Sequence, residues 1–487
     1  MDKLLGFTPD ADPALPGVIT ACTNLIPYEN GMKGAPTGNT PASVPALAAA
    51  CAGAAVITKL DDTRRTFAGT STKLYELSGG AWADVARASV YTGGIDNRWS
   101  FAQFGNSTLA SNLSDTMQRS AGSGAFADIG SAPKAKIIFS VGAFVMALNT
   151  VDGTYGTTPN RWWCCASYDE TSWTPSVSTL ATTGQLVSTA GQITAGGRLG
   201  EYAVAYKDKA IYVGQFVGAP AVWDWVQVPG GEAGCVGQEA WCDIGAGGHF
   251  IVGQDNFWQF DGSRPQPLGV GQLRQWFFDN SNPGYRYKTK CVFDRQNNVV
   301  WTFYCALGST TPNMALVYHL QTQQWGSVTL SVEAALNYIA AGATIDGMSG
   351  VSATIDGLSG YALDSQFWNV GGRALSVVNS SHQLQALTGS CASSSLTTGD
   401  AGDDDIVSTL SKIRLRFAPG YKPSAATVQT YSKMTEGDPL VPVASGSLND
   451  GKFDVLQSAR WHRATFNFTG DHRILQLGAV LMGGGNA

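Results

Sequence analysis

Hydrophobic and polar residues alternate in short runs along most of the chain, and residues typical of turns separate these runs. Between residues 61 and 340, two such runs followed by a closing aromatic residue recur in 65–85, 99–129, 136–176, 201–228, 248–270 and 297–328. Alternation with a period of two is typical of half-buried β-strands, and Gly, Asn, Asp and Lys between the runs favour hairpin turns. We therefore predict a series of β-hairpins over this region.

The hairpin units follow one another every ~35 to 60 residues, around the range expected for the blades of a β-propeller. A four-stranded sheet buries little surface alone, whereas blades packed around an axis bury both faces. Tryptophans near the unit ends would fill the spaces between blades: Trp82, Trp173, Trp225 and Trp325. We predict an all-β chain with an irregular propeller of about six blades at 61–340. A large β-sandwich built from similar hairpins is the alternative.

The regions on either side of this series have different patterns. Residues 1–60 are rich in Pro, Gly and Ala, which predicts an extended N-terminal arm contributing to assembly. Residues 341–360 contain Ala-Thr-Ile-Asp-Gly twice; a period of ten residues is too short for a blade, so this segment is predicted to be a linker. Residues 361–487 alternate again and predict a β-sandwich-like C-terminal domain. It includes a half-buried strand at 412–417 and a final hairpin that turns at 469–471.

Composition limits the functions that this chain can perform. Only 14% of the residues are charged, and depletion of charge is typical of surfaces buried in an assembly. The net charge is −6 and no basic run exceeds two residues, which argues against tight nucleic-acid binding but not against a duplex passing by. The N-terminus lacks the features of a signal peptide, and no apolar run reaches the length of a membrane helix. Nine scattered cysteines predict free, buried thiols in a reducing compartment.

No motif indicates catalysis. The five histidines stand apart from metal-binding spacings, and neither a nucleophile elbow nor a phosphate-binding loop is present. Residues 167–173, SYDETSW, resemble the Asp-box of sialidase-like propellers with one position missing, and such boxes are structural turns. Residues 399–405, GDAGDDD, lack the ligand spacing of a calcium loop, which favours a solvated loop. We therefore predict no enzyme activity, no cofactor, and no catalytic, cofactor-binding or metal-ligating residues.

Three stretches together resemble one family, the tail nozzle or tail tubular B-like proteins of short-tailed bacteriophages. The resemblance rests on the N-terminal "LPGVITACTNLIPYENGMKGAPTG", on the propeller units "GTSTKLYELSGGAW" and "GQDNFWQFDGSRPQPLG", and on the C-terminal "GSLNDGKFDVLQSARWHRATFNFTGDHRILQLGAVLMGGG". It implies a structural virion protein that forms a ring of six copies below the portal and the tail adaptor. It also implies contacts with tail fibre or receptor-binding proteins, and passage of double-stranded DNA without sequence-specific binding. Such a protein is assembled in the host cytoplasm and resides in the tail of the virion.

A second hypothesis comes from a different class of protein. A glycan-binding or glycan-cleaving, sialidase-like propeller for host-surface recognition would also fit a chain of β-hairpins. This hypothesis expects a pocket at the axial mouth of the propeller, lined by arginine, tryptophan and acidic side chains. The two hypotheses therefore differ in what they expect on the propeller axis.

Overall fold

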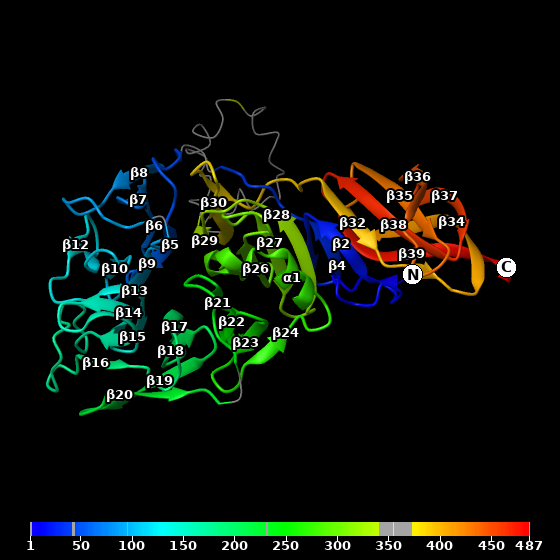
Figure 1. The fold of residues 1–487 in the computed structure, drawn as a ribbon. Coiled ribbons are helices and arrows are strands. Elements are labelled where there is room, and N and C mark those ends of the chain that lie inside the picture. The colour runs from blue at the N-terminus through cyan, green and yellow to red at the C-terminus, as the bar shows by residue number, and fades with distance from the viewer. Residues whose placement is uncertain are drawn as a thin grey trace.

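The computed structural model describes residues 2–40, 44–94, 96–229, 232–339, 354 and 373–486. Nearly all regular elements are strands, arranged as a ring of antiparallel sheets beside a two-sheet sandwich (Figure 1). Both termini lie at the sandwich, and N-terminal strands occupy the region between it and the ring (Figure 1). No helix in the described part of the chain is long and apolar enough to cross a membrane.

Six antiparallel units of four strands, blades 1 to 6, follow one another along the chain. Blades 1 to 3 comprise β5 (Gly53–Thr58), β6 (Arg64–Gly69), β7 (Leu74–Ser78), β8 (Ala81–Asp84), β9 (Ser100–Phe104), β10 (Ser107–Ser111), β11 (Gln118–Ala121), β12 (Ala127–Asp128), β13 (Lys134–Val141), β14 (Phe144–Asp152), β15 (Gly156–Cys164) and β16 (Thr182–Gln185). Blades 4 to 6 comprise β17 (Ile193–Leu199), β18 (Tyr202–Lys207), β19 (Ile211–Gly218), β20 (Val222–Gln227), β21 (Trp241–Asp243), β22 (His249–Val252), β23 (Phe257–Phe260), β24 (Gln266–Leu268), β25 (Lys290–Asp294), β26 (Val299–Tyr304), β27 (Met314–His319) and β28 (Trp325–Thr329). The helix α1 (Arg274–Asn280) and the 3-10 turn η2 (Pro283–Lys288) connect blades 5 and 6, and η1 (Gly245–Gly247) lies in a turn of blade 5.

A three-stranded sheet closes the ring as blade 7. It consists of β29 (Ala334–Ile339), β30 (Arg373–Val378) and β31 (Leu384–Ala386). Its first strand lies against the first strands of both blade 6 and blade 1. Asn39 exchanges two backbone hydrogen bonds with Ala386, of 2.7 and 2.8 Å, so the N-terminal segment occupies the outer position of this blade. The prediction of an irregular propeller of about six blades is confirmed, and blade 7 completes its ring.

Aromatic side chains fill the spaces between blades, as predicted from the tryptophans at the unit ends. Trp325 of blade 6 is fully buried and contacts Phe250 and Phe257 of blade 5. Trp225 of blade 4 lies 5.6 Å from Trp162 of blade 3, measured between ring centroids. Each blade therefore buries its faces against its neighbours, which an isolated four-stranded sheet could not do.

The N-terminal segment is extended, as predicted, but it is built into the fold of its own chain. Strands β1 (Asp2–Lys3) and β2 (Ile19–Thr23) pair with the sandwich. Strands β3 (Leu25–Tyr28) and β4 (Gly31–Gly34) form a hairpin, here called the bridging hairpin. On one side it pairs with β28 of blade 6 and on the other with β39 (Arg473–Asn486) of the sandwich. One continuous sheet therefore runs from the propeller into the sandwich.

Glycines allow the bridging hairpin to approach both neighbours closely. A Cβ at Gly326 of β28 would lie 2.3 Å from the Leu25 carbonyl oxygen, and a Cβ at Gly31 would lie 2.1 Å from that of Ile474. Both obstacles are backbone atoms, which cannot rotate away as a flexible side chain can. Two close backbone contacts therefore hold the hairpin between the propeller and the sandwich.

The C-terminal region is a β-sandwich, as predicted. One sheet contains β39, β34 (Ile406–Phe417) and β37 (Lys452–Ala459), and the other contains β2, β32 (Ser394–Thr398), β38 (Trp461–Thr469), β35 (Ala425–Lys433) and β36 (Val441–Ser447), with β33 (Ala401–Gly402) beside β38. Phe453 and Phe466 face each other across the two sheets, with ring centroids 5.2 Å apart. Ile413 and Leu415 point inward on β34, which confirms the predicted alternation at 412–417.

The structure corrects two details of the predicted organisation. Blade 1 begins at Gly53, within the predicted arm, and blade 7 takes 373–386 from the predicted C-terminal domain, because β30 pairs with β29. The turn at 469–471 does not form a hairpin: β38 and β39 lie in opposite sheets, since their alternating apolar residues pack face to face. Apart from Thr354, the duplicated linker at 341–360 lies outside the described residues.

Candidate functional site

A cavity of about 400 Å³ opens at one end of the propeller. Five of its lining residues lie at the start of a blade's first strand or within two residues before it. They belong to blades 1, 2, 5, 6 and 7, respectively: Cys51, Arg98, Glu239, Lys290 and Glu333. Because the first strands surround the propeller axis, the cavity lies at the axial mouth, and we call it the axial cavity.

Glu239 is the centre of an ion cluster at this mouth. Arg98 donates from Nε to Glu239 Oε2 over 2.8 Å and from Nη2 to Oε1 over 3.2 Å. Lys290 donates to Glu239 Oε2, the oxygen that also accepts from Arg98 Nε. Arg98 also donates to the carbonyl oxygens of Cys51 and Glu333, over 2.9 and 2.8 Å. The guanidinium of Arg98 thus links the segments that lead into the first strands of blades 1, 2, 5 and 7.

Opposing effects set the ionisation of this cluster. Burial disfavours the charged form of Glu239, but the positive charges of Arg98 and Lys290 outweigh it and lower the pKa of the carboxyl to about 2. Burial, together with repulsion from Arg98, lowers the pKa of the Lys290 ammonium to about 8, although Glu239 acts in the opposite direction. At neutral pH the carboxylate therefore stays ionised between two cations.

The other charged groups around the cavity are also paired. Glu333 accepts from the Cys51 backbone N–H over 2.8 Å, and its second oxygen lies 2.8 Å from His382 Nδ1. At the rim, the Lys288 ammonium lies 3.0 Å from a carboxylate oxygen of Asp96. These contacts tie blade 7 to blade 1, and η2 to the segment that precedes blade 2.

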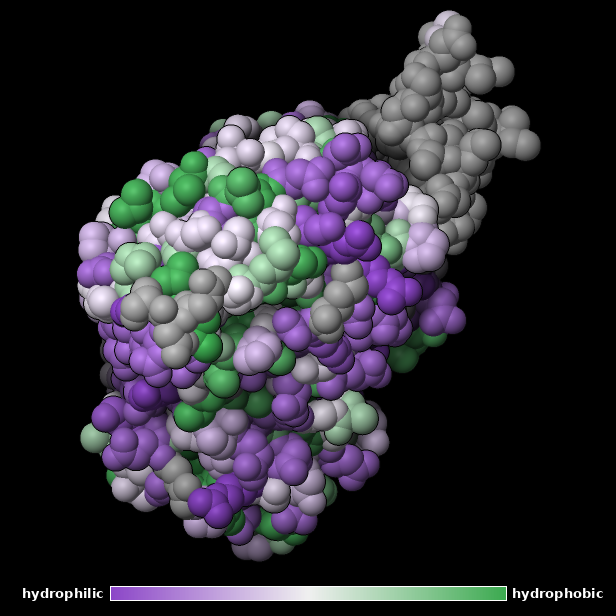
Figure 2. All heavy atoms as spheres, turned by 90° about the vertical axis from the view of Figure 1, so that its right-hand side faces the viewer, coloured by the Kyte–Doolittle hydropathy of each residue, from purple (hydrophilic) through white to green (hydrophobic). Residues whose placement is uncertain are grey.

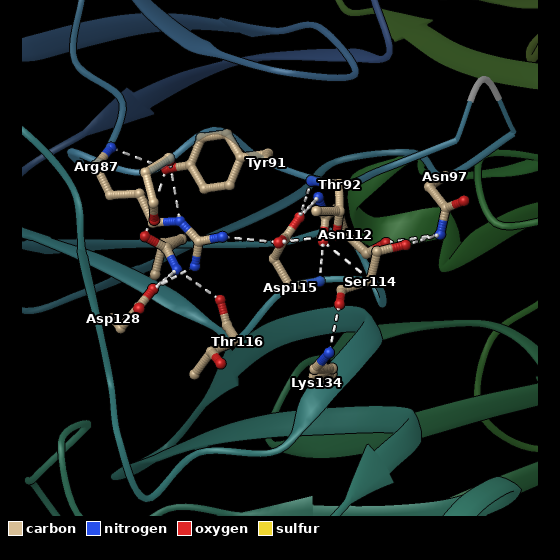
Figure 3. Close-up of polar contacts among 12 residues, drawn as sticks. Arg87, Tyr91, Thr92, Asn97, Asn112, Ser114, Asp115, Thr116, Asp128 and Lys134 are labelled. Atoms are coloured by element: carbon tan, nitrogen blue, oxygen red, sulfur yellow. Dashed lines mark hydrogen bonds and ion pairs between the residues drawn. The ribbon is translucent and has the colours of Figure 1, made fainter.

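A second polar network holds the loop that carries Arg98. The guanidinium of Arg87 lies 2.7 Å from the carboxylates of both Asp115 and Asp128 (Figure 3). Asp115 also accepts from the backbone N–H of Thr92 over 2.9 Å. Asn97, next to Arg98, donates to Ser114 Oγ over 2.8 Å (Figure 3). These bonds fix the connection between blades 1 and 2, and with it the position of Arg98.

The chemistry available at the axial cavity is that of a structural ion cluster. Burial raises the pKa of the Cys51 thiol to about 11, so this sulfur is protonated at neutral pH and is a poor nucleophile. Glu239 and Glu333 are each bound by cationic or N–H donors, which disfavours a role as general acid. Among the described residues, the lining includes one arginine, Arg98, and no tryptophan, so it matches only part of the pocket that the glycan hypothesis expects.

The Asp-box-like segment at 167–173 forms a turn. Asp169 accepts from the backbone N–H and the hydroxyl of Thr171, over 3.0 and 2.6 Å. Trp173 is fully buried, and its indole donates to the carbonyl oxygen of Glu170 over 2.9 Å. The segment therefore serves the packing of blade 3.

The acidic segment 399–405 separates into a buried residue and an exposed loop. Asp400 is buried and lies 2.7 Å from Arg463 and 2.9 Å from Lys433. Asp404 accepts from the indole of Trp461 over 2.7 Å. Within the described ranges, no group of three or more His, Cys, Asp or Glu side chains is arranged to hold a metal ion.

The cysteines are free thiols, as predicted, and eight of the nine are buried. Burial raises the pKa of the adjacent Cys164 and Cys165 to about 12. Both are therefore packing residues of blade 3.

Sequence reasoning did not identify the residues of the axial cluster. Arg98, Glu239 and Lys290 are far apart in the chain and belong to no motif. Their shared signal is a charged residue just before, or at the start of, the first strand of a blade. Because this chain has few charged residues, a charged residue at the start of a predicted first strand would have stood out in the sequence.

Comparisons with known proteins give distant likenesses only. No family model matches the sequence, and no curated protein matches it. A structure of YCF48 bound to D1 peptide is 12% identical, covers 60% of this chain and 84% of that chain, and has a TM-score of 0.35. The computationally designed Ika8 protein is 10% identical, with coverage of 71% and 99% and a TM-score of 0.36. BBS1N in complex with ARL6DN is 7% identical, with coverage of 68% and 75% and a TM-score of 0.27. At such TM-scores these likenesses carry no argument, so the propeller fold rests on the sheet topology and the ring of first strands.

Proposed function

We propose that this chain is a non-enzymatic structural subunit of a short-tailed phage tail, of the nozzle type. The observation that carries this proposal is the sheet that runs from blade 6 through the bridging hairpin into the sandwich. Because strand pairing and close backbone contacts cross both junctions, we expect the propeller and the sandwich to move as one body. A subunit that withstands the pressure of genome ejection needs this rigidity.

The axial cluster supports the same proposal. Arg98 and Lys290 pair with Glu239 and join several blades, which stabilises the ring of blades. Among the described residues, each charged side chain that lines the mouth has an ionic or hydrogen-bonded partner. A low overall charge also suits a chain that buries much of its surface in an assembly.

The proposed assembly is a ring of six copies in the virion tail, below the portal and adaptor. Double-stranded DNA would pass through the channel of the ring without sequence-specific contacts. The adaptor would bind one end of the ring, and tail fibre or receptor-binding proteins would bind its outside or its far end. Assembly would take place in the host cytoplasm.

A glycan-binding propeller is the second candidate, and the position of the axial cavity favours it. The cavity has room for a sugar unit and carries Arg98 and acidic groups, which are common in glycan sites. The internal pairing of these groups weighs against it, because a ligand would have to break existing ion pairs.

Quantitative mass spectrometry of purified virions, combined with a polysaccharide assay on the purified protein, separates the two candidates. The nozzle proposal predicts a few copies of the chain per virion, resistant to salt washing, and no release of reducing sugar. A protein that is absent from virions and releases sugar would refute it. Loss of that release on Arg98→Met would then assign the activity to the axial cavity.

A further inference from the structure

The outer face of one sandwich sheet carries a concentration of positive charge. On β34, Lys412, Arg414 and Arg416 point outward, because Ile413 and Leu415 between them are buried. Strand pairing brings two more cations to the same face: Arg414 pairs with Lys452 of β37, and Arg416 pairs with Gln476, which in turn pairs with Lys3 of β1. We call this surface the basic face: Lys3, Lys412, Arg414, Arg416 and Lys452.

Four of these five cations have no side-chain partner among the described residues, and the fifth, Lys452, pairs with Asp454. In the described part of the molecule, no hydrogen bond or ion pair joins Lys3, Lys412, Arg414 or Arg416 to another side chain. Asp454, paired with Lys412 in the strand register, lies 3.3 Å from Lys452 and is the face's carboxylate. Five cations and one carboxylate leave a strongly positive surface on a chain whose net charge is −6. Such a surface is complementary to an acidic partner.

Apolar side chains continue the basic face toward the start of β34. Leu456 of β37 is 72% exposed, and Met482 of β39 is 53% exposed. Val480 pairs with Lys412, and Met482 pairs with Thr409, so both lie on the outer side of the sheet. The side of the molecule that the sandwich faces shows hydrophobic and hydrophilic areas next to one another (Figure 2). Exposed apolar patches mark interaction sites, and methionine and arginine are enriched in protein interfaces, whereas phosphate backbones are bound by polar and charged groups.

The sandwich also carries an acidic loop, which lies far from the arginines of the basic face. Asp403, Asp404 and Asp405 are all exposed in the loop that leads into β34. Their described contacts are to the indole of Trp461 and to a backbone N–H within the loop, so none of them pairs with a cation. At ~3.3 Å per residue, Asp405 and Arg416 lie roughly 35 Å apart along one strand. The loop therefore cannot reach Arg414 or Arg416 of its own chain.

We propose that the basic face docks the acidic loop 403–405 of a second copy of this chain. The contact is heterologous, with different surfaces on the two copies, and such contacts generate a ring when the rotation between successive copies closes. Leu456, Val480 and Met482 form the apolar part of the interface, and Arg414 and Arg416 meet the aspartates. This inference rests on the proposed function as an assembling subunit and names the surface that assembles.

Reciprocal charge reversal in the full-length protein tests the inference. The variants are Arg414→Glu/Arg416→Glu, Asp403→Lys/Asp405→Lys, and the combination of all four substitutions. The control, Lys209→Glu/Arg264→Glu, changes the net charge as the arginine variant does, but at exposed positions on blades 4 and 5. Mass photometry over a concentration series at ~150 mM salt measures association, and anisotropy of a labelled 30-base-pair duplex measures DNA binding.

Each reversal alone should weaken association at least ~tenfold, because like charges would meet across the interface. The combined variant should regain most of the association, and the control should match the wild type. Wild-type association that neither reversal changes would overturn this inference alone, as would failure of the combined variant to recover. Loss of DNA binding in the arginine variant with unchanged association would assign the face to nucleic acid and also overturn it. A wild-type chain that stays monomeric throughout would overturn both the inference and the proposed function.

Discussion

Gly326→Ala should weaken the junction between blade 6 and the bridging hairpin. The new Cβ would lie 2.3 Å from the Leu25 carbonyl oxygen, 2.9 Å from Ile26 Cα and 3.0 Å from Pro27 Cδ, whereas ordinary contacts begin at 3.4 Å. These atoms belong to the backbone or to a rigid ring. The whole of β3 would therefore have to move by about 1 Å to relieve the overlap.

The size of the effect follows from what β3 loses when it moves. Overpacking of a well-packed site costs about 1–3 kcal/mol. The neighbouring Ser327–Leu25 pairing joins the hairpin to the blade, and each weakened hydrogen bond there adds about 0.5–1.5 kcal/mol. We therefore expect a total of ~2–4 kcal/mol, directed at the junction between the two bodies.

Differential scanning calorimetry measures the effect. The wild type should unfold in one transition, because the continuous sheet couples the two bodies. Gly326→Ala should lower the transition temperature and separate the sandwich from the propeller. Gly437→Ala is the matched control, because a Cβ there meets nothing within 4 Å. Unfolding of both variants like the wild type would show that the close approach at Gly326 does not hold the junction together.

Three further predictions concern the axial cluster, the buried histidines and the thiols. Arg98→Met should destabilise the protein by about 3–5 kcal/mol in urea unfolding, because it leaves Glu239 with one cation and two carbonyl oxygens without donors; an unchanged midpoint would contradict this role. Burial lowers the pKa of four histidines below 6.5 in the folded chain, so the unfolded chain gains more protons as the pH falls through that value. The four histidines are His249, His319, His462 and His472. The free energy of unfolding should therefore decline below pH 6.5, and a urea midpoint that stays constant from pH 7 to 5 would count against this prediction. Cys164 and Cys165 should react with a thiol reagent only after unfolding, and rapid labelling of either in the native protein would disprove their burial.

The repeating part of the fold could be predicted from the sequence because its signals are local. Alternation and turn residues mark each hairpin, and blades made of such hairpins bury their faces only when packed around an axis. The strand at 412–417 shows the same logic, since Ile413 and Leu415 are buried between outward-pointing cations. Pairing within a blade connects neighbours in the sequence, so the local pattern was sufficient.

The bridging hairpin could not be predicted in the same way. Residues 25–34 contain a turn signal at Asn30-Gly31, but the partners of the hairpin lie about 300 and 440 residues further along. Nothing in a local pattern identifies such partners. For the same reason, the local pattern predicted a hairpin of β38 and β39, although the two strands belong to opposite sheets of the sandwich. The axial cluster likewise depends on ring closure, which brings together single charges from distant blades.

The most direct test of the proposed function is cryo-electron microscopy of the purified full-length protein and of the virion tail. We predict a closed ring with a central channel in both samples, in which propeller and sandwich keep the relative position that the bridging hairpin gives them. The acidic loop of each copy should lie against the basic face of the next. Monomers in solution, together with no density for this chain in the tail, would rule out the proposed function.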